Sequence, residues 1–301
     1  MLREWTRLVG HRGQVHGLAF TEGGLKLVSG GRDDAIHVWN PESGELLQRL
    51  ESGSTGLGAL ACAKDGSLVA AHWRQLQQVW IYDLSSGAQV AQLPLAKVSS
   101  LDFSPAGDRL LVASPEGLSV WDLMSYQELS KVEGSAKGSR QARFDRAGAK
   151  ILSAGAIPFC YDAETLEALG PLFTHSLHAF DMGHCLDLTE NEDKVVVGWG
   201  HSERQDVGSV RVASWPEMVS IQVMRGHKPA VGSVALSPEG RHVVSVGLRD
   251  NLIKVWEIAS GRMVEEHVLP GVTVARFSPT GVFLATGSAM TSELMLWEWA
   301  S

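Results

Sequence analysis

Short runs in which apolar residues alternate with polar ones recur along the whole chain, each bounded by turn-forming residues. In the first 50 residues such runs occupy 15–20, 25–29, 35–39 and 45–50. Period-two alternation is typical of half-buried β-strands, and the intervening Gly23-Gly24 and Pro41 suit tight turns. The pattern predicts a unit of four short antiparallel strands.

The third run of this unit ends on an aromatic residue that an acidic or amide residue follows, and this pair recurs along the chain. Its aromatic members are Trp39, Tyr82, Trp121, Tyr161, Trp256 and Trp297. Successive aromatics are 43, 39, 40, 95 and 41 residues apart. Because 95 fits two units but not one, we expect a degraded copy whose third strand ends near Val212-Ala213. The spacing predicts seven stacked repeats.

Two of the repeats share further residues at nearly equal spacing. They are Gly10-His11, Ser29, Asp33 and Trp39 in the first repeat, and Gly226-His227, Ser245, Asp250 and Trp256 in the sixth. These residues resemble the Gly-His to Trp-Asp signature of the WD40, or WD-repeat, family. The resemblance covers essentially the whole chain and implies an all-β fold, a seven-bladed β-propeller of four-stranded antiparallel blades around a central channel.

The last repeat has too few residues after Trp297 for a fourth strand of its own. Residues 4–8 precede the first repeat, so we expect this N-terminal strand to complete the last blade and to cover an open sheet edge. The expected single propeller, residues 1–301, then consists of that closing strand and of blades at approximately 9–50, 51–93, 94–132, 133–172, 173–223, 224–268 and 269–301.

Composition excludes several classes of protein. The formal charge of −8 disfavours binding to nucleic acid or anionic membranes. No apolar run reaches the length of a membrane span, and the first residues lack the apolar region of a signal peptide. The three cysteines are odd in number and unpaired in spacing, which argues against disulfides and a zinc site. We expect a soluble cytoplasmic protein without cofactors.

His11, Ser29 and Asp33 are the residue types of a hydrolase triad. In a WD-repeat blade, however, they resemble the internal hydrogen-bond network that links Trp, Ser, His and Asp across the strands. The same set recurs in the sixth repeat, and an enzyme seldom carries its site twice. The sequence also lacks the common nucleotide-binding and zinc-hydrolase motifs. We therefore predict a structural network and no enzymatic activity.

The fifth repeat departs most from the pattern and contains several potential metal ligands. They are His175, His178, His184, Cys185 and His201. Imidazole and thiolate are preferred donors of transition metals, but the spacing matches no closed zinc motif. A metal-binding or enzymatic propeller centred on these histidines is one alternative. The other is a long exposed loop of the kind that carries recognition.

Partners of a propeller usually meet its top face, which is formed by the loops that join each outer strand to the next inner strand and each second strand to the third. The candidate top-face residues are Gln14, His16, Arg32, Trp73, Arg74, Lys97, Ser99, Arg140, His184, Trp199, His201, Arg249 and Thr273. Arg and Trp are the residue types that dominate interface energetics.

The basic and aromatic character of this set predicts a non-catalytic scaffold, a monomeric propeller within a complex, that binds an acidic or phosphorylated peptide or partner protein. Besides the metal-binding or enzymatic alternative, a third possibility is a structural subunit that is buried in a larger complex through its rim.

Overall fold

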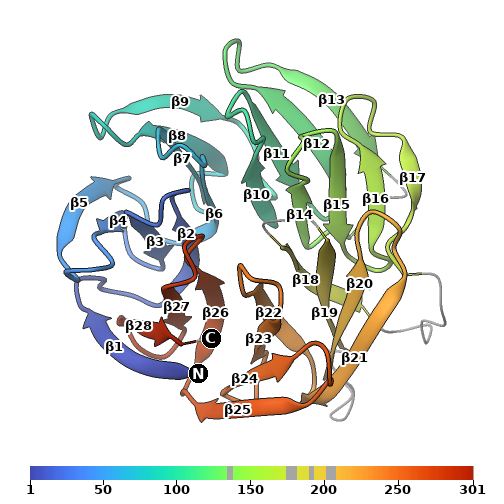
Figure 1. Cartoon of the computed structure of the whole chain (residues 1–301). Helices are drawn as coiled ribbons and strands as arrows, with labels where there is room; N and C mark the ends of the chain where they lie inside the picture. Colours follow the sequence, from blue (N-terminus) through green and yellow to red (C-terminus); the bar gives the residue numbers. More distant parts are fainter. Residues whose placement is uncertain (134–137, 174–181, 190–192, 201–207, 301) are drawn as a thin grey trace.

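A computed structural model describes residues 1–133, 138–173, 182–189, 193–200 and 208–300. The described residues form seven four-stranded antiparallel sheets, or blades, arranged in a ring (Figure 1). Each blade runs from an inner strand at the channel to an outer strand at the rim. The expected all-β, seven-bladed propeller is confirmed.

The strand bounds follow the repeat. Blades one to three comprise β2 (Val15–Phe20), β3 (Leu27–Gly31), β4 (Ala35–Trp39), β5 (Leu46–Glu51); β6 (Leu57–Cys62), β7 (Leu68–Trp73), β8 (Gln78–Asp83), β9 (Gln89–Leu93); and β10 (Ser100–Phe103), β11 (Arg109–Ala113), β12 (Gly117–Asp122), β13 (Glu128–Glu133).

Blades four and five comprise β14 (Gln141–Phe144), β15 (Lys150–Ala154), β16 (Phe159–Asp162), β17 (Ala168–Pro171); and β18 (Met182–Leu188), β19 (Lys194–Gly200), β20 (Gly208–Ser214), β21 (Ser220–His227). Blade six comprises β22 (Val231–Leu236), β23 (His242–Gly247), β24 (Leu252–Glu257) and β25 (Met263–Val268), and blade seven comprises β26 (Val272–Phe277), β27 (Phe283–Ser288), β28 (Leu294–Trp299) and β1 (Leu2–Leu8).

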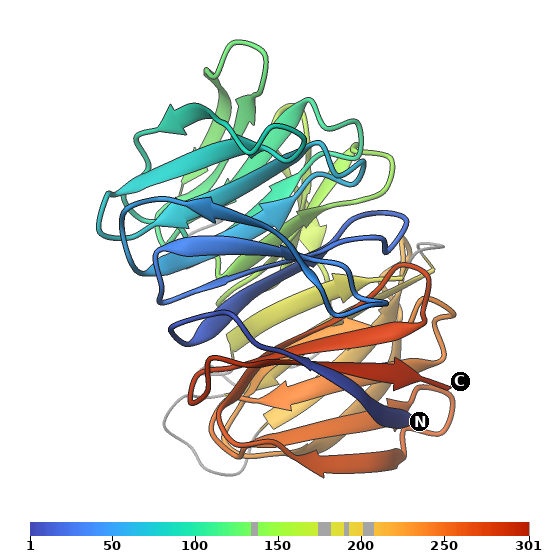
Figure 2. The same cartoon turned by 90° about the vertical axis from the view of Figure 1, so that its left-hand side faces the viewer.

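The N-terminal strand closes the ring. β1 pairs antiparallel with β28, from Leu2 opposite Trp299 to Leu8 opposite Leu294, and the two ends of the chain lie close together (Figures 1 and 2). The expected closing strand is confirmed, and it starts two residues earlier than the predicted residue 4.

The turns between first and second strands follow from local chemistry. Gly107 adopts a φ of 74°, in the left-handed region that glycine favours, and its N–H donates to Ser104 O at 2.9 Å. Gly281 in blade seven has a φ of 71° and the same bond to Ser278. The recurring Ser-Pro-x-Gly segments therefore form tight turns at the same end of the propeller.

The core lies between neighbouring blades. Trp39, Tyr82 and Tyr161 from the recurring aromatic pair are buried, and they pack in clusters that join one blade to the next. Side chains of inner strands also accept backbone N–H groups of the following blade. The donors and acceptors are Ala142 N–H to Ser100 Oγ, Phe144 N–H to Asp102 Oδ2, Leu186 N–H to Gln141 Oε1, Leu236 N–H to Asp187 Oδ2 and Ala275 N–H to Ser233 Oγ.

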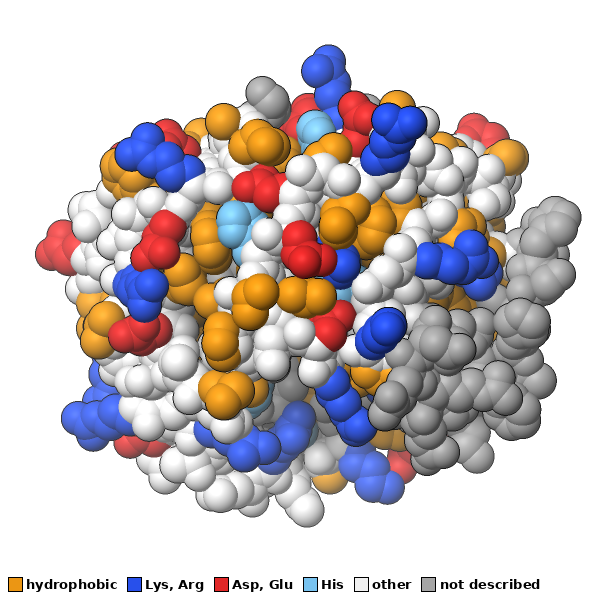
Figure 3. Space-filling model, turned by 90° about the horizontal axis from the view of Figure 1, so that it is seen from below, with side chains coloured by type: hydrophobic (Ala, Val, Ile, Leu, Met, Phe, Trp, Pro, Cys, Tyr) orange, Lys and Arg blue, Asp and Glu red, His pale blue; other side chains and the backbone are white. Residues whose placement is uncertain are grey.

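Charges of both signs are interspersed with apolar side chains on the side of the molecule seen in Figure 3. Several outer-strand charges are paired, including Arg7 with Glu293 at 3.5 Å and Lys254 with Glu266 at 2.6 Å. None of the described residues forms a helix with the length and apolarity that a membrane span requires.

Candidate functional site

A recess lies on the top face between blades one and two. His16 at the start of β2, Arg32 after β3 and Arg74 after β7 contribute its basic side chains. The recess has a volume of about 440 Å³, and we call it the top-face recess. Its lining residues are His16, Arg32, Thr55, Gly56, Leu57, Arg74 and Gln75.

The top-face recess is electropositive. Arg32 and Arg74 are exposed, and no carboxylate among the described residues forms an ion pair with either guanidinium. Burial lowers the pKa of His16, and the nearby positive charges of Arg32 and Arg74 lower it further. Two guanidinium groups thus line one recess without an acidic partner, an arrangement that suits an anionic group.

Other predicted top-face residues have different surroundings. Lys97 Nζ is already paired with Glu116 at 3.0 Å. Arg140 and Arg249 are exposed, and Arg140 Nη2 lies 3.9 Å from Met182 Sδ. Gln14 and Ser99 are half-buried. None of these five lines the top-face recess.

Three predicted top-face residues are buried rather than exposed, and a fourth is half-buried. Trp73 and Trp199 are fully buried, because β7 and β19 extend far enough to include them in the cores between blades. His184 is also buried, with Nε2 3.2 Å from Gly200 O. Thr273 is half-buried, and its one hydroxyl hydrogen is shared between Val15 O at 3.2 Å and Gly287 O at 3.4 Å, so it joins neighbouring strands.

Only part of the predicted blade-five cluster lies within the described residues. His175, His178 and His201 lie outside the described residues. Cys185 is buried, its Sγ is 3.8 Å from Val231 O, and burial raises its pKa to about 12. A thiol with so high a pKa is a poor metal ligand at neutral pH.

The triad-like residues of blade one form a closed chain of hydrogen bonds. His11 Nδ1 lies 2.6 Å from Asp33 Oδ2, and His11 Nε2 lies 2.7 Å from Ser29 Oγ. Trp39 Nε1 donates to the same Ser29 Oγ at 2.8 Å. Because the indole can only donate and the carboxylate only accept, the chain is complete when His11 Nδ1–H donates to Asp33 and Ser29 O–H donates to His11 Nε2.

Blade six repeats this chain in detail. His227 Nδ1 lies 2.8 Å from Asp250 Oδ2, His227 Nε2 lies 2.8 Å from Ser245 Oγ, and Trp256 Nε1 donates to Ser245 at 2.7 Å. Blade seven retains only the bond from Trp297 Nε1 to Thr286 Oγ1, at 3.0 Å. Ser29 and Ser245 are fully buried, so no substrate can reach either hydroxyl.

His37 is an additional buried histidine that the sequence pattern does not single out. Its ring centroid lies 4.0 Å from that of His11, and neither ring nitrogen has a hydrogen-bond partner among the described residues. His11, Asp33 and His37 place potential ligand atoms within 4.8 Å of one another. Both nitrogens of His11 are already used by Asp33 and Ser29, so a metal ion here would have to break the blade-one network.

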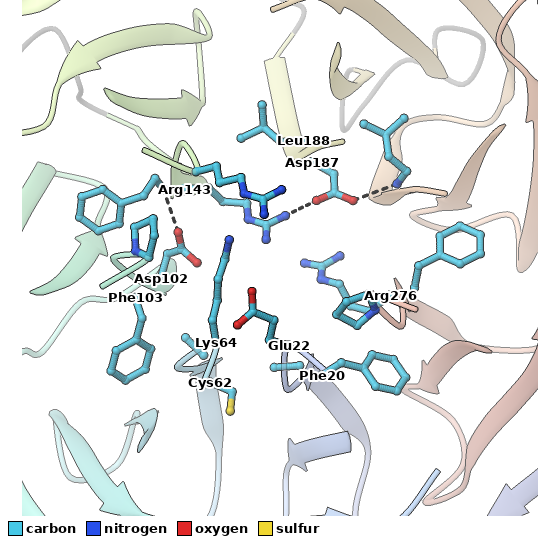
Figure 4. A pocket seen from close by; sticks show the side chains of 18 of the residues that line it. Phe20, Glu22, Cys62, Lys64, Asp102, Phe103, Arg143, Asp187, Leu188 and Arg276 are labelled. Carbon is cyan, nitrogen blue, oxygen red and sulfur yellow. Dashed lines mark hydrogen bonds and ion pairs between the residues drawn. The ribbon is translucent and has the colours of Figure 1, made fainter. Parts of the chain in front are cut away.

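The lower end of the central channel holds a second cavity, lined at the ends of the inner strands. We call it the channel cavity; it has a volume of about 220 Å³. Its charged side chains come from blades one to five and blade seven (Figure 4). They are Glu22, Lys64, Asp102, Arg143, Asp145, Arg146, Asp187 and Arg276.

The family model described as "WD domain, G-beta repeat" matches residues 3–40 and 218–257. These two segments contain the two complete hydrogen-bond networks.

The chain is also similar to curated proteins. It is 32% identical over 127 residues to "Periodic tryptophan protein 2 homolog" of Schizosaccharomyces pombe, covering 40% of this chain and 15% of the relative. It is also 32% identical over 119 residues to "Small ribosomal subunit protein RACK1y" of Oryza sativa subsp. japonica. That match covers 38% of this chain and 35% of the relative.

"THO complex subunit 3" of Arabidopsis thaliana is 22% identical over 290 residues, which cover 93% of this chain and 75% of the relative. The match to the first two relatives spans about a third of their length or less. The family-model match shows that segments of blades one and six are similar to the WD repeat, and the seven four-stranded blades have the fold that the resemblance to the WD-repeat family implied.

Proposed function

We propose that the propeller is a non-catalytic protein-interaction module whose top face binds an acidic or phosphorylated segment of a partner protein. The observation that carries this proposal is the top-face recess, where Arg32, Arg74 and His16 converge without a carboxylate partner among the described residues. Guanidinium groups bind carboxylate and phosphate oxygens in pairs, through parallel N–H donors. An acidic side chain or a phosphoryl group would supply the missing negative charge.

A role as a subunit of an assembly is consistent with the relatives. The names of two of them refer to a small ribosomal subunit and to the THO complex. Our proposal therefore includes a monomeric propeller that works within a complex. We also propose a cytoplasmic location, since Cys62, Cys160 and Cys185 are all free thiols and free thiols suit a reducing compartment.

The buried networks support a non-catalytic role. A serine nucleophile must present its Oγ to a substrate carbonyl. Ser29 Oγ is instead enclosed and accepts a hydrogen bond from Trp39, and Ser245 is held by Trp256 in the same way.

The proposal is tested with three labelled peptides of one sequence that carry phosphoserine, glutamate or serine at the central position. We expect the phosphoserine peptide to bind most tightly in fluorescence anisotropy, because its charge is close to −2. Arg32→Glu combined with Arg74→Glu should weaken binding at least about tenfold, since two attractive charges become repulsive.

The matched control is Arg241→Glu combined with Arg262→Glu. These exposed arginines lie in turns at the opposite end of the blades, and the control makes the same change in net charge. It should retain binding. If the Arg32 and Arg74 double variant binds like wild type while its circular dichroism is unchanged, the top-face proposal is wrong and the rim becomes the candidate interface.

A further inference from the structure

The seven inner strands place equivalent residues at the lower channel. The penultimate residues of β2, β6, β10, β14, β18, β22 and β26 are Ala19, Ala61, Asp102, Arg143, Asp187, Ala235 and Arg276. All except Ala235 line the channel cavity. Two arginines thus occupy the same position in blades four and seven, and their surroundings can be compared directly.

Arg143 has an acidic residue at the equivalent position in each of the two adjacent blades. Asp102 stands at the equivalent position in the preceding blade, and Asp187 in the following one. Arg143 Nη1 pairs with Asp187 Oδ1, as the dashed line in Figure 4 shows. The other oxygen, Asp187 Oδ2, accepts the backbone N–H of Leu236 at 2.9 Å. The blade-four arginine is therefore neutralised within the protein.

Arg276 has no such neighbours, since alanine occupies the equivalent position in both adjacent blades. Its Nη1 donates to Ser233 Oγ, Val234 O and Ala275 O, at 3.3, 3.3 and 2.9 Å. All three acceptors are neutral, and no carboxylate among the described residues forms an ion pair with Arg276. Burial lowers the pKa of this guanidinium, whereas the carboxylates of Asp187 and Asp102 raise it from beyond ion-pair distance. A half-buried guanidinium without a directly bonded carboxylate marks the position as a candidate binding site.

A second cation shares the cavity. Lys64 extends into it from the turn after β6 (Figure 4) and has no ion-pair partner among the described residues. Two carboxylates compete for these cations. Asp102 accepts the backbone N–H of Phe144 at 2.8 Å, and burial raises its pKa while the charges of Arg143, Lys64 and Arg276 lower it. Glu22 is exposed and forms no ion pair with either cation, so it can turn toward solvent.

We propose that the channel cavity binds a small oxyanion, such as a phosphate, sulfate or carboxylate group, through Arg276 and Lys64. The small side chains of Ala19 and Ala61 line the cavity together with Arg276, and about 220 Å³ suits a compact ligand. The site lies at the lower end of the channel, opposite the top-face recess. It is therefore independent of the proposed peptide-binding function.

Isothermal titration calorimetry with sodium phosphate, sulfate and succinate tests the site on the full chain, with sodium chloride at equal ionic strength as reference. We expect saturable binding at one site, and an increase in melting temperature with ligand concentration. The relative affinities distinguish a free inorganic ion from the carboxylate of a small molecule, and either result supports an oxyanion site.

Two variants make the test specific. Arg276→Leu should weaken binding at least about tenfold. Ala19→Asp keeps Arg276 and places a carboxylate where Asp187 stands relative to Arg143, so it should abolish binding by supplying an internal counter-ion. Glu22→Gln should strengthen binding, because it removes the competing carboxylate. Arg241→Leu, at an exposed arginine outside the cavity, is the matched control and should bind like wild type.

The absence of saturable binding beyond that of chloride would overturn the proposal. Equal binding by wild type and by the folded Ala19→Asp variant would also overturn it, even if Arg276→Leu failed to fold. Neither result would bear on the peptide test at the top-face recess, which uses different residues.

Discussion

At the scale of single residues, the blade-one network shows how one carboxylate can hold several groups in place. Asp33 Oδ2 accepts from His11 Nδ1 and from the backbone N–H of Arg12 at 3.0 Å. Through His11 the bonds continue to Ser29 and Trp39. The chain thus connects the segment before the inner strand to the second and third strands, so its loss should destabilise the whole blade.

We predict that Asp33→Ala lowers the free energy of unfolding by about 2–4 kcal/mol, because it leaves buried donors without an acceptor. Asp250→Ala should lower the free energy of unfolding by a smaller amount, since the Asp250 side chain is 12% exposed and that of Asp33 is 5% exposed. Urea denaturation measures both. Glu42→Ala, at an exposed turn residue, is the control and should change stability by less than about 0.5 kcal/mol. Wild-type stability in both Asp variants would refute a structural role.

His37 gives the molecule a specific dependence on pH. Burial, reinforced by the neighbouring His11, lowers its pKa from 6.5 to about 4. Between these values the unfolded chain binds a proton that the folded chain does not, so stability must fall as the pH decreases from about 6.5 to about 4. The shift corresponds to a loss of about 3 kcal/mol of folding stability when the pH falls below both values.

The variant His37→Leu removes this titration and replaces two unpaired ring nitrogens with an apolar side chain. We predict that it unfolds in urea with a weaker pH dependence than wild type between pH 4 and 6.5, and with equal or greater stability at pH 5. Identical pH profiles for the two proteins would show that His37 is not the titrating group.

At the scale of elements, the closing strand contributes through one buried face. Leu8 at its end is 1% exposed and packs with Trp39, Val15 and Leu294. Val9, the next residue, is 68% exposed. Substitutions at these two adjacent residues therefore separate the effect of lost packing from the effect of position in the chain.

We predict that Leu8→Ala lowers the free energy of unfolding by about 2–5 kcal/mol through loss of burial and a cavity, while Val9→Ala has little effect. Deletion of residues 1–8 should lower the melting temperature further, because it exposes the β28 edge as well. Thermal unfolding followed by circular dichroism measures all three variants. A deletion that melts like wild type would disprove the closure by β1.

The sequence was informative where a repeat kept its marker residues. The terminal aromatics Trp39 and Trp256 and the turn residues Asp33 and Asp250 locate the strands of blades one and six correctly. Blade two lacks that turn Asp, and blade five has a longer connection after its second strand. Nothing in the pattern therefore showed that the second strands continue to Trp73 and Gly200. For this reason Trp73 and Trp199 were wrongly expected at the surface.

The channel cavity could not be derived from one repeat at a time. Asp102 and Arg276 each precede a Phe-Ser-Pro turn, so their equivalence is visible in the sequence. Whether an arginine at this position has a counter-ion depends on the residue in the next blade, and for Arg276 that residue is Ala19, from the other end of the chain. Only the closed ring brings the two together.

At the scale of the whole molecule, a net charge of −8 and an electropositive recess have opposite effects on an acidic partner. The net charge repels the partner from a distance, whereas Arg32 and Arg74 attract it at contact. Exposed charges are screened beyond about 10 Å in 0.1 M salt. The balance between these effects should therefore depend on ionic strength.

We predict that the affinity of wild type for the phosphoserine peptide falls as sodium chloride is raised from 50 to 500 mM, because contact with the two arginines dominates. In the Arg32→Glu and Arg74→Glu double variant the net charge changes from −8 to −12, and only repulsion remains. Its residual affinity should stay constant or rise with salt. Fluorescence anisotropy at a series of salt concentrations measures both slopes. Parallel slopes for the two proteins would mean that the recess arginines do not supply the attraction.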